Sequence, residues 1–412
     1  MMQQIIVIGA GIVGISTALE LQRRGHSVRV FDRSGVAAET SAGNAGAFAF
    51  TEVEPLATPG IMRKAPKWLL DPLGPLSIPP AYALKIAPWM LRFWRASRAD
   101  RYQKLLGAQV SLMQHSSAAL TRQIALVDGE ARMQRDGQMQ LYESEAEYRA
   151  SLPTWELRRR HGIDFELLES REAIAERQPG LSPRFTHAGF TPNWMNTIDP
   201  KAWTEHLVQA FRDRGGQIET HEVLNLTPIE NGVRVTLANG TVDADHVVLS
   251  AGAWSHHLAQ TLGDHIPLET ERGYNTTLPE GAFDLRMHLT FSGHGFVASR
   301  INNGVRIGGA VELGGLTLPP NFKRAETLLD KARQFLPGLN TEGGTQWMGF
   351  RPSLPDSIPV IGPSPGAPNV IYAFGHGHLG LTQSAGTAEI VATLIDGQAP
   401  PIPTTPFAAN RF

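Results

Sequence analysis

A glycine-rich turn near the N-terminus constrains the fold more than any other feature of this sequence. Residues Gln3 to Ile8 form a short apolar run typical of a buried strand, and Gly9-Ala10-Gly11-Ile12-Val13-Gly14 follows it directly. The first glycine permits a tight turn, the second lets the backbone approach a pyrophosphate, and the third allows a helix to pack closely on the strand. A second predicted strand, Val28 to Phe31, ends beside Asp32, an acidic residue placed to bind ribose hydroxyls. The sequence therefore predicts a Rossmann-like dinucleotide-binding unit.

The order of the remaining elements indicates a mixed α/β (α+β) chain in which two parts are interleaved. At 412 residues the chain exceeds one ordinary domain. Elements typical of the nucleotide-binding fold occur at the start, in the middle and near the end, and strands dominate between them. We expect a Rossmann-like domain made of residues 1–60, 187–264 and 345–412. A mainly antiparallel β substrate domain is expected from residues 61–186 and 265–344.

Composition excludes several classes of chemistry. The sequence contains no cysteine, which removes disulfides, thiolate nucleophiles and cysteine-ligated metals. His376 and His378 lie two residues apart but without acidic or cysteine partners, so we expect no metal site. A net charge of −2 without long charge runs argues against a nucleic-acid partner. The first apolar stretch is too short for a signal peptide, and no apolar run reaches the roughly 18 residues that span a bilayer. These features predict a cytoplasmic protein.

The segment from Ile61 to Trp94 has two interpretations. It combines tryptophan, leucine and phenylalanine with the basic residues Lys64, Lys67 and Arg92. Aromatic and basic residues together suit a segment that lies on a membrane surface. Aromatic residues also serve protein cores, so a proline-broken helical segment packed on the second domain explains the same pattern. The first interpretation predicts peripheral contact with the inner face of a membrane.

Three further segments resemble one family of flavoenzymes. They are the small-residue loop Thr40 to Gly46, the strand and turn from Ala244 to Ser255, and a C-terminal segment that comprises Arg351 to Gly362 and Tyr372 to Thr382. All three are similar to the D-amino acid oxidase/dehydrogenase family. Within that family the sequence most resembles the D-amino acid dehydrogenases, including members that act on D-hydroxyproline.

The resemblance implies FAD as the cofactor. It is expected to be non-covalent, because the chain has no cysteine and the loop Thr40 to Gly46 has no histidine. The positive end of the helix that begins near Gly380 would stabilise a reduced, negatively charged flavin. The residues expected to contact FAD are Gly9, Gly11, Ile12, Val13, Gly14, Asp32, Arg33, Ser41, Asn44, Ala45, Gly46, Val223, Ala251, Gly252, Trp254, Gly377, His378, Leu379, Gly380, Leu381 and Thr382.

The substrate site implied by the resemblance contains an arginine and a tyrosine. Arg351 would bind the substrate carboxylate, and its planar fork suits that group. Tyr274, in the Arg-Gly-Tyr sequence that resembles D-amino acid dehydrogenases, would be the second carboxylate anchor. His378 is a candidate for assisting deprotonation of the amine, because histidine titrates near neutral pH.

The expected reaction is dehydrogenation of a D-amino acid or a D-proline-like imino acid, by hydride transfer from Cα to the flavin N5. Two alternatives stay open. One is an oxygen-using amine oxidase of the glycine or sarcosine type, and the other is a flavin-binding electron-relay subunit without a substrate pocket. The dehydrogenase interpretation implies a quinone or another acceptor in place of oxygen.

Overall fold

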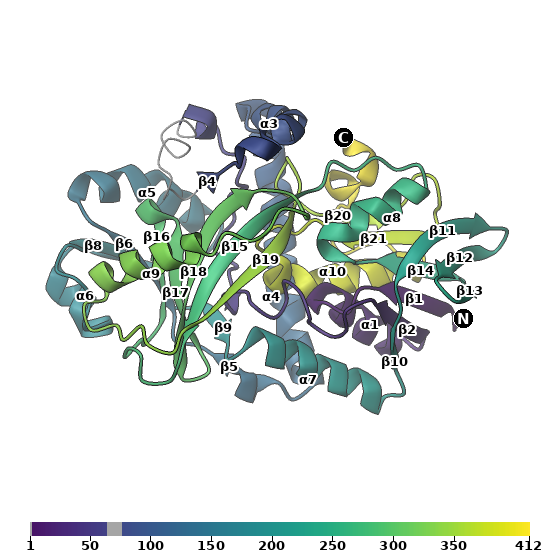
Figure 1. The fold of residues 1–412 in the computed structure, drawn as a ribbon, viewed down its shortest axis with the longest axis horizontal. Coiled ribbons are helices and arrows are strands. Elements are labelled where there is room, and N and C mark those ends of the chain that lie inside the picture. The colour runs from purple at the N-terminus through teal and green to yellow at the C-terminus, as the bar shows by residue number, and fades with distance from the viewer. Residues whose placement is uncertain (1, 64–75) are drawn as a thin grey trace.

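The computed structural model describes residues 2–63 and 76–412, and these fold around two large β-sheets (Figure 1). A mainly parallel six-stranded sheet lies on the right of the view, and a larger mixed sheet lies on the left. In spatial order the smaller sheet contains β10 (Gln217–Thr220), β2 (Ser27–Asp32), β1 (Gln4–Ile8), β14 (His246–Leu249), β21 (Val370–Phe374) and β20 (Val360–Pro363). Only β20 runs antiparallel to its neighbour.

The turn between β1 and α1 (Ile12–Arg23) explains the spacing of its glycines. Gly9 has φ +111°, a backbone conformation that residues with a Cβ atom rarely adopt. A Cβ on Gly14 would lie 1.9 Å from the carbonyl oxygen of Gly9, so the helix can approach the strand only with glycine there. This confirms the predicted strand–helix–strand start.

The larger sheet contains nine strands and is mainly antiparallel. Its main path is β19 (Thr345–Ser353), β15 (Glu269–Leu278), β18 (Gly304–Leu313), β17 (Phe296–Ile301), β16 (His288–Phe291), β6 (Gln138–Tyr142), β8 (His187–Thr191) and β7 (Glu166–Leu168), and β4 (Leu76–Ser77) pairs with β18. Two three-stranded sheets complete the set. They are β11 (Val223–Ile229), β12 (Gly232–Leu237) and β13 (Gly240–Ala244), and β3 (Ala47–Phe48), β9 (Met195–Thr197) and β5 (Met133–Gln134).

The expected boundaries at residues 187 and 345 differ from the strand pairing. β8 and β19 fall in parts expected to belong to the nucleotide-binding domain, but both pair within the large antiparallel sheet. The reason is that β19 pairs along nearly its whole length with β15, a partner about 75 residues earlier in the chain. Local sequence patterns do not reveal such distant partners.

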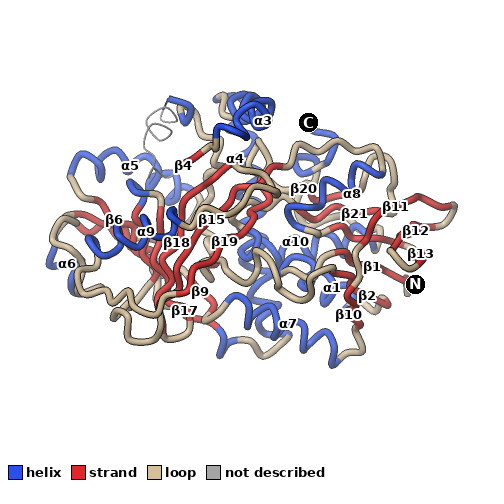
Figure 2. Tube along the Cα trace, viewed as in Figure 1, coloured by secondary structure: helices blue, strands red, loops and turns tan. Residues whose placement is uncertain are grey.

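Helices pack against the sheets, and loops connect the helices to the strands (Figure 2). The helices beyond α1 are α3 (Ala83–Ala96), α4 (Ala99–Leu126), α5 (Glu145–Arg160), α6 (Arg171–Arg177), α7 (Pro200–Asp213), α8 (Ser255–Thr261), α9 (Lys323–Phe335) and α10 (Gly380–Ile395).

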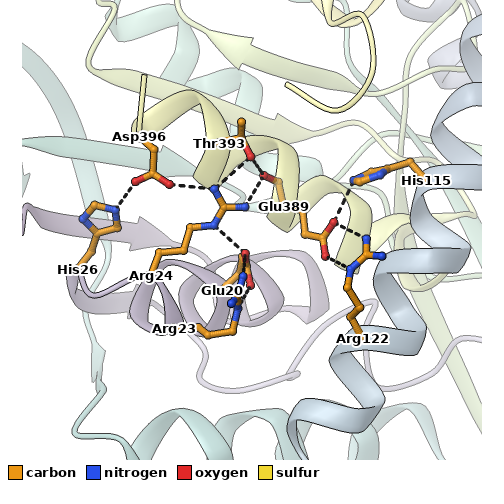
Figure 3. Close-up of polar contacts among 9 residues, drawn as sticks. All are labelled: Glu20, Arg23, Arg24, His26, His115, Arg122, Glu389, Thr393 and Asp396. Atoms are coloured by element: carbon orange, nitrogen blue, oxygen red, sulfur yellow. Dashed lines mark hydrogen bonds and ion pairs between the residues drawn. The ribbon is translucent and has the colours of Figure 1, made fainter. Parts of the chain in front are cut away.

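The main hydrophobic core joins α1, α4, α7 and α10 to the parallel sheet. A polar network connects α1, α4 and α10 (Figure 3). Arg24 donates to Glu20 at 2.7 Å and to Asp396 at 2.8 Å, and Asp396 also contacts His26 at 2.9 Å. Arg122 on α4 binds Glu389 on α10. These contacts fix the last helix, whose first turn reaches the site described below.

The segment with two interpretations is described only in part, because residues 64–75 lie outside the described residues. Its helix α3 buries Ile86 and Trp89 but leaves Leu84, Leu91 and Trp94 exposed. Within residues 2–63 and 76–412, no helix combines the length and apolar character needed to cross a bilayer.

Candidate active site

A cavity of about 810 Å³ lies between the two large sheets. Its walls come from the β1–α1 turn, the loop at residues 39–45, strands β15, β18 and β19, and the turn that leads into α10. Segments from the start, middle and end of the chain therefore meet at one site, as the sequence predicts.

Asp32 is held at the end of β2 by backbone amides. Its carboxylate accepts hydrogen bonds from Ala10 N at 2.7 Å, Ser34 N at 2.8 Å and Gly35 N at 2.9 Å. These bonds fix the carboxylate beside the glycine-rich turn. An extended dinucleotide with its pyrophosphate at the start of α1 would bring its ribose to this end of the cavity.

The loop at residues 40–46 is hydrogen-bonded to the start of α1 and to the antiparallel sheet. The hydroxyl of Ser41 accepts a hydrogen bond from Ile12 N at 3.0 Å, and Asn44 accepts one from Gly46 N at 2.8 Å. From the antiparallel sheet, Asn275 donates to the carbonyl of Gly43 at 2.7 Å, and Arg306 donates to the carbonyl of Asn44 at 2.5 Å. The loop is thus a rigid part of the cavity wall.

Arg306 places a buried positive charge beside this loop. Burial lowers the pKa of Arg306 to about 10, which still leaves the guanidinium charged at neutral pH. The residue lines the cavity, together with Gly308 and Gly309 on the same strand. Sequence analysis missed Arg306, although its position in an alternating strand is the signal that could have identified it.

The middle segment supplies another part of the wall. Val223, Ala251, Gly252 and Trp254 line the cavity, and the guanidinium of Arg33 lies 4.2 Å from the centre of the Trp254 ring. These residues were predicted to contact the cofactor, and the structure brings them together with Asp32.

The C-terminal turn brings the first residues of α10 to the cavity. Gly375 and Gly377 have φ of +85° and +56°, and Gly377 N donates to the carbonyl of Pro352 at 2.7 Å. Gly380 and Leu381 line the cavity, so the positive end of α10 faces it. Four predicted contact residues support the wall without lining the cavity: Gly14, Gly46, Leu379 and Thr382.

Arg351 lies on β19 with its guanidinium over Gly273 of β15. Nη1 donates to the carbonyl of Ala310 at 3.1 Å, and the side chain makes no other hydrogen bond or ion pair to the described part of the chain. Burial lowers the pKa of Arg351, and nearby Glu271 opposes this shift. The remaining N–H groups of the Arg351 guanidinium can therefore bind an anion in the cavity.

His378 lines the cavity near Arg351. Burial lowers its pKa; Glu271 and Glu52 oppose that shift, and Arg351 adds to it. The ring is therefore neutral at neutral pH. His376 has a different environment, because its Nε2 contacts the Thr387 hydroxyl at 2.9 Å and burial lowers its pKa to about 3.

The structure does not bring the hydroxyl of Tyr274 together with Arg351. That hydroxyl donates to Glu312 at 3.1 Å and accepts a hydrogen bond from Asn321 N at 3.0 Å. Its ring packs edge-on against Phe322. The role of Tyr274 as a second carboxylate anchor stays a prediction that this geometry does not support.

Two acidic residues of the cavity, Glu52 and Glu271, were also missed by sequence analysis. Glu52 contacts the Arg158 guanidinium at 3.4 Å, whereas Glu271 lies opposite Arg351 in the strand register. The signal for Glu271 is its place in the same alternating strand as Gly273, two residues away.

The fold and this cavity are those of a dinucleotide-binding oxidoreductase. The cavity extends from the turn before α1 to the strands around Arg351, and at Gly252 in its wall an added Cβ would meet nothing within 4 Å, so this part of the wall faces open space. These residues fit FAD. Residues 4–394 match the family model described as DAO, FAD dependent oxidoreductase. The chain belongs to this family of FAD-dependent oxidoreductases.

Relatives match along nearly the whole length. The chain is 34% identical to the D-amino-acid oxidase of Bradyrhizobium diazoefficiens, with 100% of this chain and 99% of the relative covered. It is 31% identical to the D-amino acid dehydrogenase of Sinorhizobium medicae, with 99% and 100% covered. Its fold matches the crystal structure of glycine oxidase from Geobacillus kaustophilus with a TM-score of 0.80, at 19% identity and with 100% and 99% covered.

Proposed function

We propose that this protein oxidises D-amino acids or D-proline-like imino acids with non-covalently bound FAD. The observation that carries the proposal is the half-buried guanidinium of Arg351, which opens into the cavity with donors left for a carboxylate. The names of the relatives at 31% and 34% identity support the substrate class and its D configuration.

Residues on both sides of the cavity have defined roles in this reaction. FAD, when bound, supplies the hydride acceptor. Asp32, the first turn of α1 and the loop at residues 40–46 would hold it, and no cysteine is present to attach it. Arg351 binds the substrate carboxylate and thereby orients Cα. The positive end of α10 stabilises negative charge that develops beside Gly380 and Leu381. The product is an imine, which water hydrolyses unless it is cyclic.

The test is anaerobic mixing of the purified yellow protein with a panel of amino acids. The panel contains D- and L-alanine, D- and L-proline and the hydroxyproline epimers, and bleaching of the flavin band identifies substrates. Acid precipitation should release the flavin into the supernatant. A colourless protein, or no bleaching by any amino acid, would refute the proposal.

Arg351→Met tests the carboxylate site. We expect the variant to retain FAD while KM rises about 30-fold or more, because a charge partner of the carboxylate is lost. Arg351→Lys keeps the positive charge but loses the planar guanidinium with its paired N–H donors. The KM of this variant should therefore lie between those of the wild type and the Met variant. Unchanged kinetics in Arg351→Met would place the substrate elsewhere.

The electron acceptor is proposed to be a membrane quinone. The exposed residues Leu84, Leu91 and Trp94 of α3 lie beside the basic residues Arg92 and Arg95, a combination that suits an anionic membrane surface. The expected results are slow peroxide formation, fast reduction of a soluble quinone, and co-sedimentation with anionic vesicles. Peroxide production that matches substrate turnover would instead support an oxidase, the name of one relative.

A further inference from the structure

Glu271 is a buried acidic residue that opens into the cavity. It lies on β15 directly opposite Arg351 of β19 in the strand register, and the residue is 7% exposed. Within residues 2–63 and 76–412, its carboxylate makes no ion pair and no side-chain hydrogen bond. The side chains of Glu271 and Arg351 therefore lie on the same wall of the cavity, and no ion pair joins them.

The neighbouring residue on β15 shows what a satisfied pair looks like in this sheet. On the opposite face, Arg272 is fully buried and donates to Glu312 at 3.1 Å and to three backbone carbonyls. Glu271 and Arg351 are also directly opposite each other in the strand register, but among the described residues no hydrogen bond or ion pair joins their side chains. A buried carboxylate without a partner is unfavourable, so its environment suits a cation from outside the chain.

The spacing of the two charges selects the kind of cation. Directly opposite residues on antiparallel strands have Cβ atoms about 5 Å apart. One small ligand can thus reach both side chains only if its own anionic and cationic groups are close together. An α-amino acid zwitterion has this property, because its carboxylate and ammonium are attached to the same carbon.

Glu52 is the competing candidate for a cation site in this cavity. Its carboxylate already contacts the buried guanidinium of Arg158 at 3.4 Å, so it has a partner. Burial lowers the pKa of His378, which is close enough to feel the charges of Glu271 and Arg351, so its ring adds no positive charge at neutral pH. The unpaired charge nearest to Arg351 is therefore that of Glu271.

We propose that Glu271 binds the substrate ammonium while Arg351 binds its carboxylate, so that the site selects amino and imino acids over 2-hydroxy acids. This inference rests on the proposed function and goes further, because it names the group that recognises the amine. Ligands with a carboxylate but without an amine should gain nothing from Glu271.

The test compares two ligands that differ only in the amine. D-Proline carries a ring nitrogen, and (R)-tetrahydro-2-furoic acid has oxygen in its place. Their dissociation constants are measured on the holoenzyme, from rapid-mixing reduction kinetics for D-proline and from perturbation of the flavin spectrum for the furoate. In Glu271→Gln, D-proline binding should weaken about 10- to 100-fold, the range for a hydrogen bond to a charged group. Binding of the furoate should stay within about twofold of the wild type or become tighter, because a negative charge near its carboxylate is lost.

Glu269→Gln is the matched control. Glu269 lies two residues earlier on β15, accepts a hydrogen bond from the Tyr82 hydroxyl at 2.7 Å and does not line the cavity. A glutamine can keep that bond, so both ligands should bind as in the wild type. Equal weakening of both ligands in Glu271→Gln, or no change in either, would overturn the proposal.

Two further comparisons apply if Glu271→Gln does not retain FAD or if no amino acid reduces the flavin. Should Glu271→Gln fail to retain FAD, Glu271→Asp keeps the charge and should lose less of the preference for D-proline than Glu271→Ala. An Asp variant as impaired as the Ala variant contradicts an electrostatic role. If the wild type binds D-proline but no amino acid reduces the flavin, the proposed function fails, whereas the ligand comparison by flavin-spectrum perturbation still decides the role of Glu271.

Discussion

The guanidinium of Arg351 lies over the backbone of Gly273, so closely that a Cβ at position 273 would come within 2.3 Å of Nη2 and 2.5 Å of Cζ. Gly273 is therefore part of the proposed carboxylate site although it has no side chain. The two residues come from adjacent strands, β19 and β15, and their contact fixes the height of the guanidinium above the sheet. A substitution at position 273 should therefore change substrate binding without changing FAD binding, and this can be tested.

Gly273→Ala should displace the guanidinium without unfolding the chain, because the clashing atoms are the far end of a flexible side chain. We expect KM for amino acids to rise about tenfold or more, since the hydrogen bonds to the carboxylate become misaligned. The flavin content and the melting temperature should stay close to those of the wild type. Steady-state kinetics and the flavin-to-protein absorbance ratio measure both effects. An unchanged KM would show that Arg351 does not depend on this contact.

Gly14→Ala should prevent FAD binding and destabilise the chain. The new Cβ would lie 1.9 Å from the Gly9 carbonyl oxygen and 2.8 Å from the Ser250 hydroxyl, and the first of these atoms is backbone that cannot move alone. Separation of α1 from β1 should lower the melting temperature and leave the purified protein colourless. The control is Gly107→Ala on α4, where the added Cβ meets nothing within 4 Å. A yellow Gly14→Ala protein with wild-type stability contradicts this packing argument.

The parts that sequence predicts well are those set by local patterns. The strand, glycine turn and helix at residues 4–23 follow from a short apolar run and the steric demands of Gly9 and Gly14. Helix Lys323–Phe335 follows from its apolar periodicity. Arg351, Gly377 and Gly380 line the cavity, and their place at the site was expected from the family resemblance, not from a local pattern.

The parts that sequence does not predict depend on direction and on distant partners. Alternation along β15 places Arg272 and Tyr274 on one face and Glu271 and Gly273 on the other, but it does not say which face meets the cavity. The pairing of β15 with β19 decides this, because it puts Glu271 opposite Arg351. The expectation that Tyr274 lies at the carboxylate came from the family resemblance alone, and its hydroxyl contacts Glu312.

The network around Arg24 should make stability depend on acid pH. Burial raises the pKa of Glu20 and of Asp396, but hydrogen bonds outweigh this effect, from Arg23 and Arg24 for Glu20 and from Arg24 and His26 for Asp396. Both pKa values thus lie below the ordinary values of 4.5 and 3.8. Carboxyl groups with lowered pKa in the folded state contribute stability above those ordinary values and lose it as the pH falls through the folded pKa.

Arg24→Met removes the shared partner of these two carboxylates (Figure 3). We expect the free energy of unfolding to fall by about 1–3 kcal/mol at pH 7. The difference from the wild type should shrink below about pH 4, because both carboxylates become protonated there in either protein. Urea denaturation at several pH values measures this. Arg135→Met is the control, since its pair with Glu130 is exposed and should contribute little. A difference that is constant with pH would assign the effect to packing alone.

His378 should produce the acid limb of the activity profile. Burial, and to a smaller extent Arg351, lowers its pKa below the ordinary 6.5, against the opposing effect of Glu271 and Glu52. The ring is neutral above its folded pKa, and protonation below it adds a positive charge beside Arg351 that repels the substrate ammonium. We therefore expect kcat/KM of the wild type to fall as the pH drops below 6.5, and His378→Asn to flatten this decline while keeping activity at pH 7 within about tenfold.

His376→Asn is the matched control for that experiment. His376 is buried against Thr387 and its pKa of about 3 lies below the range in which the enzyme is assayed, so its replacement should lower stability but leave the acid limb in place. The measurement is kcat/KM for the best substrate between about pH 5 and 8, with FAD in excess. An acid limb that persists unchanged in His378→Asn would assign it to another group.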